Sequence, residues 1–191
     1  ILINNWEATY FDFTEFDILR IASKAKEVGV ELFVLDDGWF GARNSDTAGL
    51  GDYNVNKKKL PSGLAGLSKK IHTKGLKFGL WFEPESVNAD SDCYRAHPDW
   101  AVKCVDRDPS LGRHELILDL SKKEVQDYLI NSVSGILKSA QIEFVKWDMN
   151  RNISDITFND YEPGEFYHRY ILGLYRVMAE LTKMFPDVLF E

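Results

Sequence analysis

The sequence has few of the residues that build disulfide frameworks and metal centres. Among 191 residues there are two cysteines, Cys93 and Cys104, and four histidines. Neither set has the spacing of a CxxC or zinc motif, which favours a reducing compartment. The first residues also lack the pattern of a secretory signal, so we expect a cytoplasmic protein. We expect neither a metal nor a cofactor.

Long apolar runs and excess positive charge are missing as well. No apolar segment approaches the ~20 residues that a membrane-spanning helix needs, so no membrane partner is expected. Lys and Arg number 23 against 30 Asp and Glu, for a net charge of −7. Without a basic patch, nucleic acid is not an expected partner. No GxGxxG or Walker loop follows a strand, which disfavours nucleotide binding.

Apolar and aromatic residues, by contrast, are abundant. The chain is 45% hydrophobic and 13% aromatic, and it has five tryptophans. A chain of this length and composition buries one sizeable core, so residues 1–191 are expected to form one domain or part of a larger one. Tryptophan serves either as core or as a flat apolar platform for a ligand such as a sugar.

The most informative segment is 142–151, where a mostly apolar run enters Lys146, Trp147 and Asp148. Side chains alternate along a strand, so Lys146 and Asp148 are expected on one face and Trp147 on the other. An ammonium group beside Asp148 would favour its ionised form. An ionised, positioned carboxylate is what a covalent nucleophile requires, although a salt-bridged strand end would show the same pattern.

Two other segments repeat this arrangement. The apolar run 32–35 ends in Asp36 and Asp37, and the run 76–82 ends in Glu83 and Glu85, each with tryptophan nearby. Carboxyl ends of parallel strands meet at one edge, so three acidic strand ends indicate one convergent site. Glu83 and Glu85 are expected to brace loops rather than to take part in chemistry.

Strands and helices alternate along the chain. Strands are expected at 6–11, 31–36, 76–82, 142–147 and 188–190. Helices are expected from Thr14, with Asp17 completing an approximate capping box; from Ser62; from Ser121, with a capping box to Glu124; and over about 163–184. This order predicts an α/β fold with parallel strands and helices packed outside.

Loop lengths favour a (β/α)8 TIM barrel over an open doubly wound sheet. Helix-to-strand links are short, whereas the strand-to-helix segments 38–60 and 86–120 are long, as at the active-site face of such barrels. Five strands cannot close an eight-stranded barrel. We therefore expect this chain to hold about the first five strands, as a fragment of a longer chain.

Five segments carry a family resemblance: LDDGWFG at 35–41, GLGDY at 49–53, FGLWFEPE at 78–85, HPDW at 97–100 and KWDMNR at 146–151. In this order they resemble the catalytic barrel of glycoside hydrolase family 36 α-galactosidases. The resemblance implies cleavage, with retention of configuration, of terminal α-galactosyl groups from substrates such as melibiose and raffinose. It also implies that the full-length protein is a homo-oligomer.

The same resemblance implies roles for individual residues. Asp148 falls where the family carries its nucleophile. The residues at sugar-binding positions are Asp36, Asp37, Trp6, Trp81, Arg113, Lys146 and Asn150. The family more often has Asn after the arginine, where this chain has His114, which weakens the role of Arg113.

The family's general acid/base, an Asp after the sixth strand, has no counterpart in this sequence. Two alternatives therefore stay open. One is a metal-dependent barrel enzyme with Asp36, Glu83 and Asp148 as Mg²⁺ ligands. The other is a sugar-binding remnant without catalysis.

Overall fold

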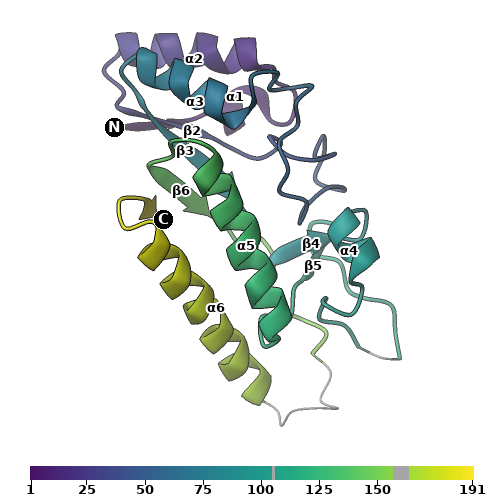
Figure 1. The fold of residues 1–191 in the computed structure, drawn as a ribbon. Coiled ribbons are helices and arrows are strands. Elements are labelled where there is room, and N and C mark those ends of the chain that lie inside the picture. Colours follow the sequence, from purple (N-terminus) through teal and green to yellow (C-terminus); the bar gives the residue numbers. More distant parts are fainter. Residues whose placement is uncertain (105, 157–163) are drawn as a thin grey trace.

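The structure is a computed structural model that describes residues 1–104, 106–156 and 164–191. Five parallel strands form its main sheet, in the order β1-β2-β3-β6-β7 (Figure 1). Their bounds are Leu2–Asn4, Leu32–Leu35, Lys77–Phe82, Phe144–Trp147 and Leu189–Phe190. Each strand pairs in parallel with the preceding strand of the sheet.

A helix connects each strand of this sheet to the next. The connecting helices are α2 (Glu15–Glu27), α3 (Gly63–Thr73), α5 (Lys123–Ser139) and α6 (Glu165–Met184). Their apolar sides and the strand residues Phe33, Leu80 and Val145 belong to one core, so the helices cover one face of the sheet. This repeated strand–helix unit is that of a (β/α)8 barrel, of which the chain contains five strands.

The chain enters the sheet earlier than we expected. The predicted strand 6–11 is wrong: β1 precedes it, and Trp6–Thr9 form the short helix α1. The Asn4 side-chain oxygen accepts a hydrogen bond from the backbone N–H of Trp6 at 2.7 Å, which turns the chain directly after the strand. Such local side-chain bonds compete with strand pairing, and they override an apolar run.

Capping was predicted correctly for one helix and wrongly for another. Thr14 and Asp17 form the expected reciprocal capping box at α2. Ser121 does not cap α5, which begins at Lys123 after Lys122. Its hydroxyl binds the carboxylate of Asp119 at 2.6 Å instead, and the same carboxylate takes its backbone N–H. A local Asx-type turn therefore displaced the predicted cap.

The long segment after β3 contains structure that we did not predict. Strands β4 (Ser86–Asn88) and β5 (Glu115–Ile117) pair antiparallel beside the main sheet. Helix α4 (Asp92–Ala96) follows β4 and is capped by Ser91. This small subdomain projects from the carboxyl end of the main sheet (Figure 1). The apolar run 116–118 was the signal for β5.

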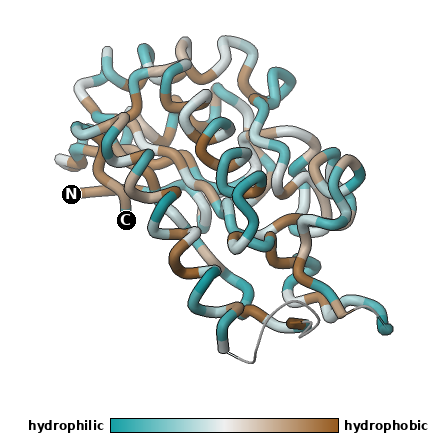
Figure 2. The backbone as a smooth tube through the Cα atoms, turned by 60° about the horizontal axis from the view of Figure 1, so that its bottom comes forward, coloured by the Kyte–Doolittle hydropathy of each residue, from teal (hydrophilic) through white to brown (hydrophobic). Residues whose placement is uncertain are grey.

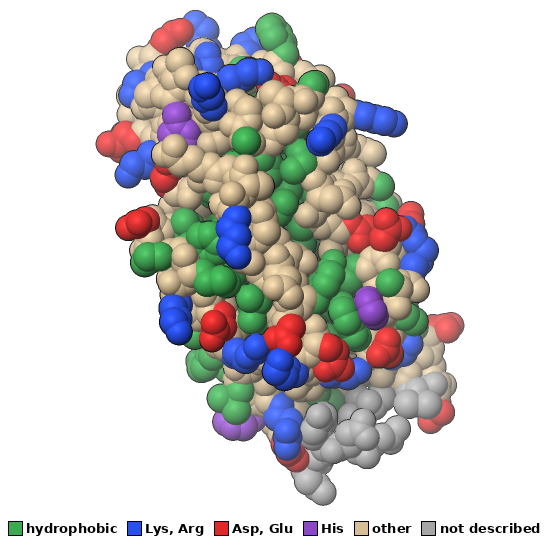
Figure 3. All heavy atoms as spheres, viewed as in Figure 1, with side chains coloured by type: hydrophobic (Ala, Val, Ile, Leu, Met, Phe, Trp, Pro, Cys, Tyr) green, Lys and Arg blue, Asp and Glu red, His purple; other side chains and the backbone are tan. Residues whose placement is uncertain are grey.

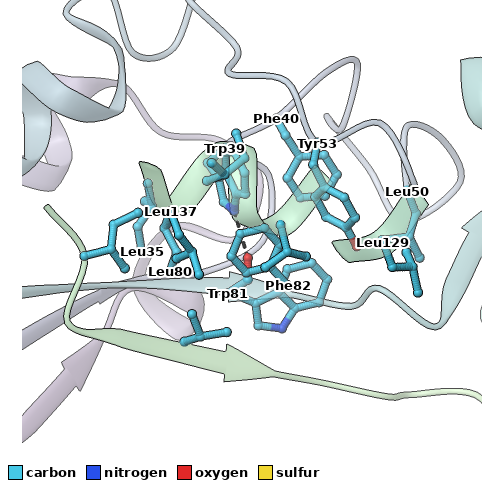
Figure 4. Close-up of a cluster of buried hydrophobic side chains, with 14 of the residues drawn as sticks. Leu35, Trp39, Phe40, Leu50, Tyr53, Leu80, Trp81, Phe82, Leu129 and Leu137 are labelled. Atoms are coloured by element: carbon cyan, nitrogen blue, oxygen red, sulfur yellow. Dashed lines mark hydrogen bonds between the residues drawn. The ribbon is translucent and has the colours of Figure 1, made fainter. Parts of the chain in front are cut away.

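The core lies between the sheet and the helices. Its aromatic part consists of Trp39, Phe40, Tyr53, Trp81 and Phe82, and the Trp39 indole N–H donates to the Trp81 carbonyl at 2.9 Å (Figure 4).

Hydrophobic and hydrophilic residues alternate along the outer helices (Figure 2). Charged side chains of both signs are intermixed on the face drawn in Figure 3. No helix in the described ranges is long and apolar enough to cross a membrane.

The opposite, inner face of the sheet is partly open. It bounds a cavity of about 160 Å³ that is lined by Leu2, Asn4, Val34, Phe144, Lys146 and Glu191. These residues come from β1, β2, β6 and the end of β7, so the sheet curves enough for its two edge strands to border one space. Gly79 makes room on this face, because a Cβ there would lie 3.0 Å from Phe144.

Candidate active site

The acidic strand ends converge, as the sequence predicted. Lys146, within β6, and Asp36, directly after β2, form an ion pair, with Nζ 3.3 Å from Oδ2. The indole N–H of Trp81, near the end of β3, donates to Oδ2 of Asp148 at 3.0 Å. Residues from the ends of three strands, among them Asp36 and Lys146, which are 110 positions apart in the chain, thus meet at one edge of the sheet. Parallel pairing brings these ends together.

Asp148 is held by two side-chain donors. Besides Trp81, the Asn150 side chain donates to the same oxygen at 2.8 Å. The other oxygen, Oδ1, accepts the backbone N–H of Met149 at 3.1 Å. The Asp148 backbone N–H still bonds the Phe82 carbonyl at 2.8 Å, so the residue is anchored to the sheet while its half-buried side chain lies beyond it.

The ammonium group of Lys146 has a different partner from the one expected. Its ion pair is with Asp36 rather than with Asp148, so the predicted Lys146–Asp148 pairing is wrong. Lys146 lies opposite Trp81 in the sheet, and its long side chain crosses β3 to reach the end of β2. Asp36 also accepts hydrogen bonds from the Asn4 side chain and from the backbone N–H of Asp37.

Asp37 is bound by a residue that the sequence reasoning missed. Arg43 is fully buried, and its guanidinium forms a fork on the Asp37 carboxylate, with Nε 3.0 Å from Oδ1 and Nη2 2.8 Å from Oδ2. Burial raises the pKa of Asp37, and Arg43 opposes that rise. An arginine within an otherwise small and polar loop, six residues after an acidic strand end, was the available signal.

Arg43 also ties this loop to the β4–β5 subdomain. Its Nη1 donates to the Asn88 side-chain oxygen at 2.9 Å, and that oxygen also accepts the backbone N–H of Leu50. Arg–carboxylate forks are among the strongest polar contacts in proteins. Asp37 is therefore rigidly oriented, and its carboxylate retains acceptor capacity for further donors.

Glu83 and Glu85 brace the site, as expected. Glu83 accepts the backbone and side-chain N–H groups of Asn150, at 2.5 and 3.1 Å. Glu85 accepts the indole N–H of Trp147 at 3.0 Å and the hydroxyl of Tyr170 at 2.6 Å. Asn150 thereby connects Glu83 to Asp148.

Trp6 and Arg113 are the other two predicted site residues. Trp6 is half-buried in α1, directly after β1, and packs edge-on against Tyr10 and Phe11. Arg113 is exposed and has a positive φ of 53°. Burial raises the pKa of Glu83, and the charge of Arg113 opposes that rise. Trp39 belongs to the core (Figure 4).

A metal centre gains no support from the arrangement of the acidic side chains. Within residues 1–104, 106–156 and 164–191, no three His, Cys, Asp or Glu side chains are grouped so that they could hold an ion. Asp36, Glu83 and Asp148 instead accept hydrogen bonds from separate amide and ammonium donors. Both cysteines are unpaired.

Comparison with known proteins agrees with the sequence motifs. A model of the melibiase family matches residues 1–191. The chain belongs to this family. It is 55% identical to the α-galactosidase AgaA of Geobacillus stearothermophilus, covering all of this chain and 27% of that protein. It is 48% identical to the α-galactosidase Mel36A of Lactobacillus acidophilus, covering 26% of that protein.

Solved structures of the family have the same fold. A crystal structure of an AgaA variant in complex with raffinose, described as a GH36 α-galactosidase, matches with a TM-score of 0.95 and 54% identity. The match covers all of this chain and 27% of the other. The chain thus spans roughly a quarter of the length of these relatives. The predicted family and barrel fold are confirmed.

Proposed function

We propose that this chain forms the nucleophile-bearing part of a retaining α-galactosidase that removes terminal α-D-galactosyl groups from oligosaccharides such as melibiose and raffinose. The observation that carries the proposal is the double anchoring of Asp148 by Trp81 and Asn150 at the end of β6. A family relative bound to raffinose supports the substrate class.

In this mechanism Asp148 attacks the anomeric carbon of the galactosyl group. The bond to the leaving oxygen breaks as a covalent glycosyl ester forms, and a general acid protonates the leaving oxygen. Water, deprotonated by the same group, then hydrolyses the ester and restores Asp148. Hydrogen bonds from Trp81 and Asn150 orient the carboxylate for attack.

We assign recognition of the galactose hydroxyls to the group around Asp36. Lys146 has ammonium protons beyond the one directed at Asp36, and both Asp36 and Asp37 have acceptor positions to offer. We assign Asn150 and Arg113 to the same recognition role. Trp6 supplies aromatic surface against which a sugar C–H face packs, and the buried Trp81 takes part through its indole N–H, which holds Asp148.

The general acid/base is assigned to a residue outside this chain. The described carboxyls around Asp148 have other partners: Asp36 binds Lys146, Glu83 binds Asn150, and Glu85 binds Trp147 and Tyr170. A retaining enzyme needs its two carboxyls roughly 5–5.5 Å apart, so the acid would approach from a further barrel strand.

We further propose that residues 1–191 are the first five strands of the catalytic domain of a longer protein. Leu2 of β1 and Leu189 of β7, on the two edge strands, are both exposed, and further strands between them would close the barrel. That the full-length protein is a homo-oligomer stays a prediction. A cytoplasmic location also stays a prediction, and the two unpaired cysteines support it.

Kinetics of Asp148→Asn in the full-length protein test the function. With an aryl α-galactoside, kcat is expected to fall by roughly 10³-fold or more, because the amide cannot form the ester. Asp99→Asn, which alters an exposed carboxylate, is the matched control and is expected to behave as wild type. Equal activity of Asp148→Asn and the control would contradict the proposal.

The two alternative functions give different results in the same protein. A metal-dependent enzyme would bind Mg²⁺ in calorimetric titration and lose activity with a chelator. A sugar-binding remnant would bind galactose and show no turnover with aryl α-galactosides in the wild type. The retaining glycosidase is expected to show turnover that a chelator leaves intact.

A further inference from the structure

Glu115, at the start of β5, is buried in an unusual way. Its side chain has no exposed surface, and neither carboxylate oxygen accepts a hydrogen bond from an N–H or hydroxyl group in the described part of the chain. Its side-chain partner is another carboxyl, that of Glu83. Burying a carboxylate without donors is strongly unfavourable, so this group calls for an explanation.

Three arginines act on the Glu115 carboxyl through their charge, but the hydrogen bonds of Arg43 and Arg151 go to other groups. Arg43 donates to Asp37 and Asn88, and the terminal nitrogens of Arg151 donate to Ser110, Asn152 and Ser154. Arg113, from the turn before β5, acts on Glu83 and Glu115 through its charge. The arginines therefore moderate the charge of the pair without satisfying the oxygens of Glu115.

A proton held between the carboxyls of Glu115 and Glu83 would explain why Glu115 is buried without a donor. Burial, with the nearby Glu83 as the next cause, raises the pKa of Glu115 to about 8, so Glu115 is neutral at pH 7. Burial also raises the pKa of Glu83, but the two N–H groups of Asn150 oppose that rise, whereas Glu115 has no such donors. The proton therefore resides on Glu115, where it can form a hydrogen bond to the Glu83 carboxylate.

We propose that Glu115 is a positioning residue: its protonated carboxyl donates to Glu83, which fixes Asn150, which in turn holds the carboxylate of Asp148. The chain of contacts is Glu115 to Glu83, Glu83 to both N–H groups of Asn150, and the Asn150 side chain to Asp148 at 2.8 Å. The inference rests on the proposed nucleophilic role of Asp148.

The arrangement predicts a loss of activity in alkaline solution. When Glu115 loses its proton, two buried carboxylates face each other without a proton between them. Their repulsion displaces Glu83, and Asn150 follows because both of its N–H groups are bound there. Asp148 then loses one of its two side-chain donors.

Glu115→Gln in the full-length protein tests this role. The amide keeps a donor toward Glu83 but has no proton to lose in this range. With p-nitrophenyl α-galactoside, whose leaving group needs little protonation, wild-type kcat is expected to fall near pH 8. The kcat of the variant is expected to fall only at higher pH.

Glu124→Gln, which removes an exposed carboxylate from α5, is the control and should follow wild type. Identical alkaline limbs for Glu115→Gln and wild type would overturn the proposal.

Glu115→Leu separates positioning from titration. It removes the donor, so kcat at pH 6 is expected to fall about tenfold, whereas Glu115→Gln should retain most of it. Equal losses in the two variants would point to packing alone and would also overturn the proposal.

Two readouts do not depend on catalysis. Glu115 takes up a proton on folding between about pH 4.5 and 8, so wild type should lose thermal stability relative to Glu115→Gln across that window, and the difference should be constant above it. Infrared spectra of the wild type should show a protonated carboxyl band at pH 6 that disappears through pH 8. Parallel melting curves or a missing band would refute the shared proton even if the protein proved not to be a galactosidase.

Discussion

At the scale of single residues, two neighbours in the sequence have different environments. Asp36 faces the Lys146 ammonium across the sheet, whereas Asp37 receives the buried Arg43 fork. In the sequence motif the two residues form one pair. In the structure only Asp36 has a partner, Lys146, that also lines the inner face of the sheet. Asp37 is as much a structural anchor for the loop after β2 as a candidate sugar ligand.

Loss of Arg43 should therefore destabilise the fold. Arg43→Met keeps the apolar stem and leaves the Asp37 carboxylate buried without its partner, and we expect the free energy of unfolding to fall by ~3–5 kcal/mol. Arg20→Met removes an exposed pair with Asp17, at 3.9 Å, and should cost only ~0–1 kcal/mol. Urea denaturation compares the two, and similar losses would show that the Arg43 fork contributes little.

At the scale of elements, the sequence predicted what depends on periodicity. The four long helices and the four later strands follow directly from apolar spacing, and the capping box of α2 was correct. The first strand and the cap of α5 were wrong because Asn4 and Asp119 bind nearby backbone N–H groups. Such competition depends on side-chain rotamers, which spacing does not encode.

In the candidate site, too, residue spacing predicted some features, whereas others depend on side-chain conformation. Clustering of Asp36, Trp81, Lys146, Asp148 and Asn150 was predictable, because parallel strand ends meet at one edge. The partners of the individual charges were not predictable, since they depend on how far long side chains reach across strands. Lys146 pairs with Asp36 for this reason, and Arg43 and Glu115 act from loops and strands outside the predicted sheet.

The packing of α6 against the α5 region gives a test at this scale. A Cβ at Gly173 would lie 1.9 Å from the backbone oxygen of Leu120, so Gly173→Ala must shift the helix and should destabilise by ~1–3 kcal/mol. Gly135→Ala in α5 meets nothing within 4 Å and should stabilise by ~0.5–1 kcal/mol. Thermal unfolding reads both changes, and a shift of the same sign in both would contradict the packing.

At the scale of the whole molecule, the curved sheet places all candidate groups on one side. The helices support the strands from outside (Figure 1). The β4–β5 subdomain is joined to the loop after β2 by the hydrogen bond between Arg43 and Asn88. Asp148 lies directly after β6, where Trp81 and Asn150 donate to its carboxylate. This placement is the physical basis for giving it the nucleophilic role.

Covalent trapping tests that role most directly. The full-length protein is treated with a fluorinated or epoxide-type galactose inactivator and digested, and the labelled peptide is sequenced by mass spectrometry. The account predicts one galactosyl label, carried by Asp148, and none in an Asp148→Asn variant. A label on Asp36, Glu83 or Glu85 instead would contradict the assignment of the nucleophile.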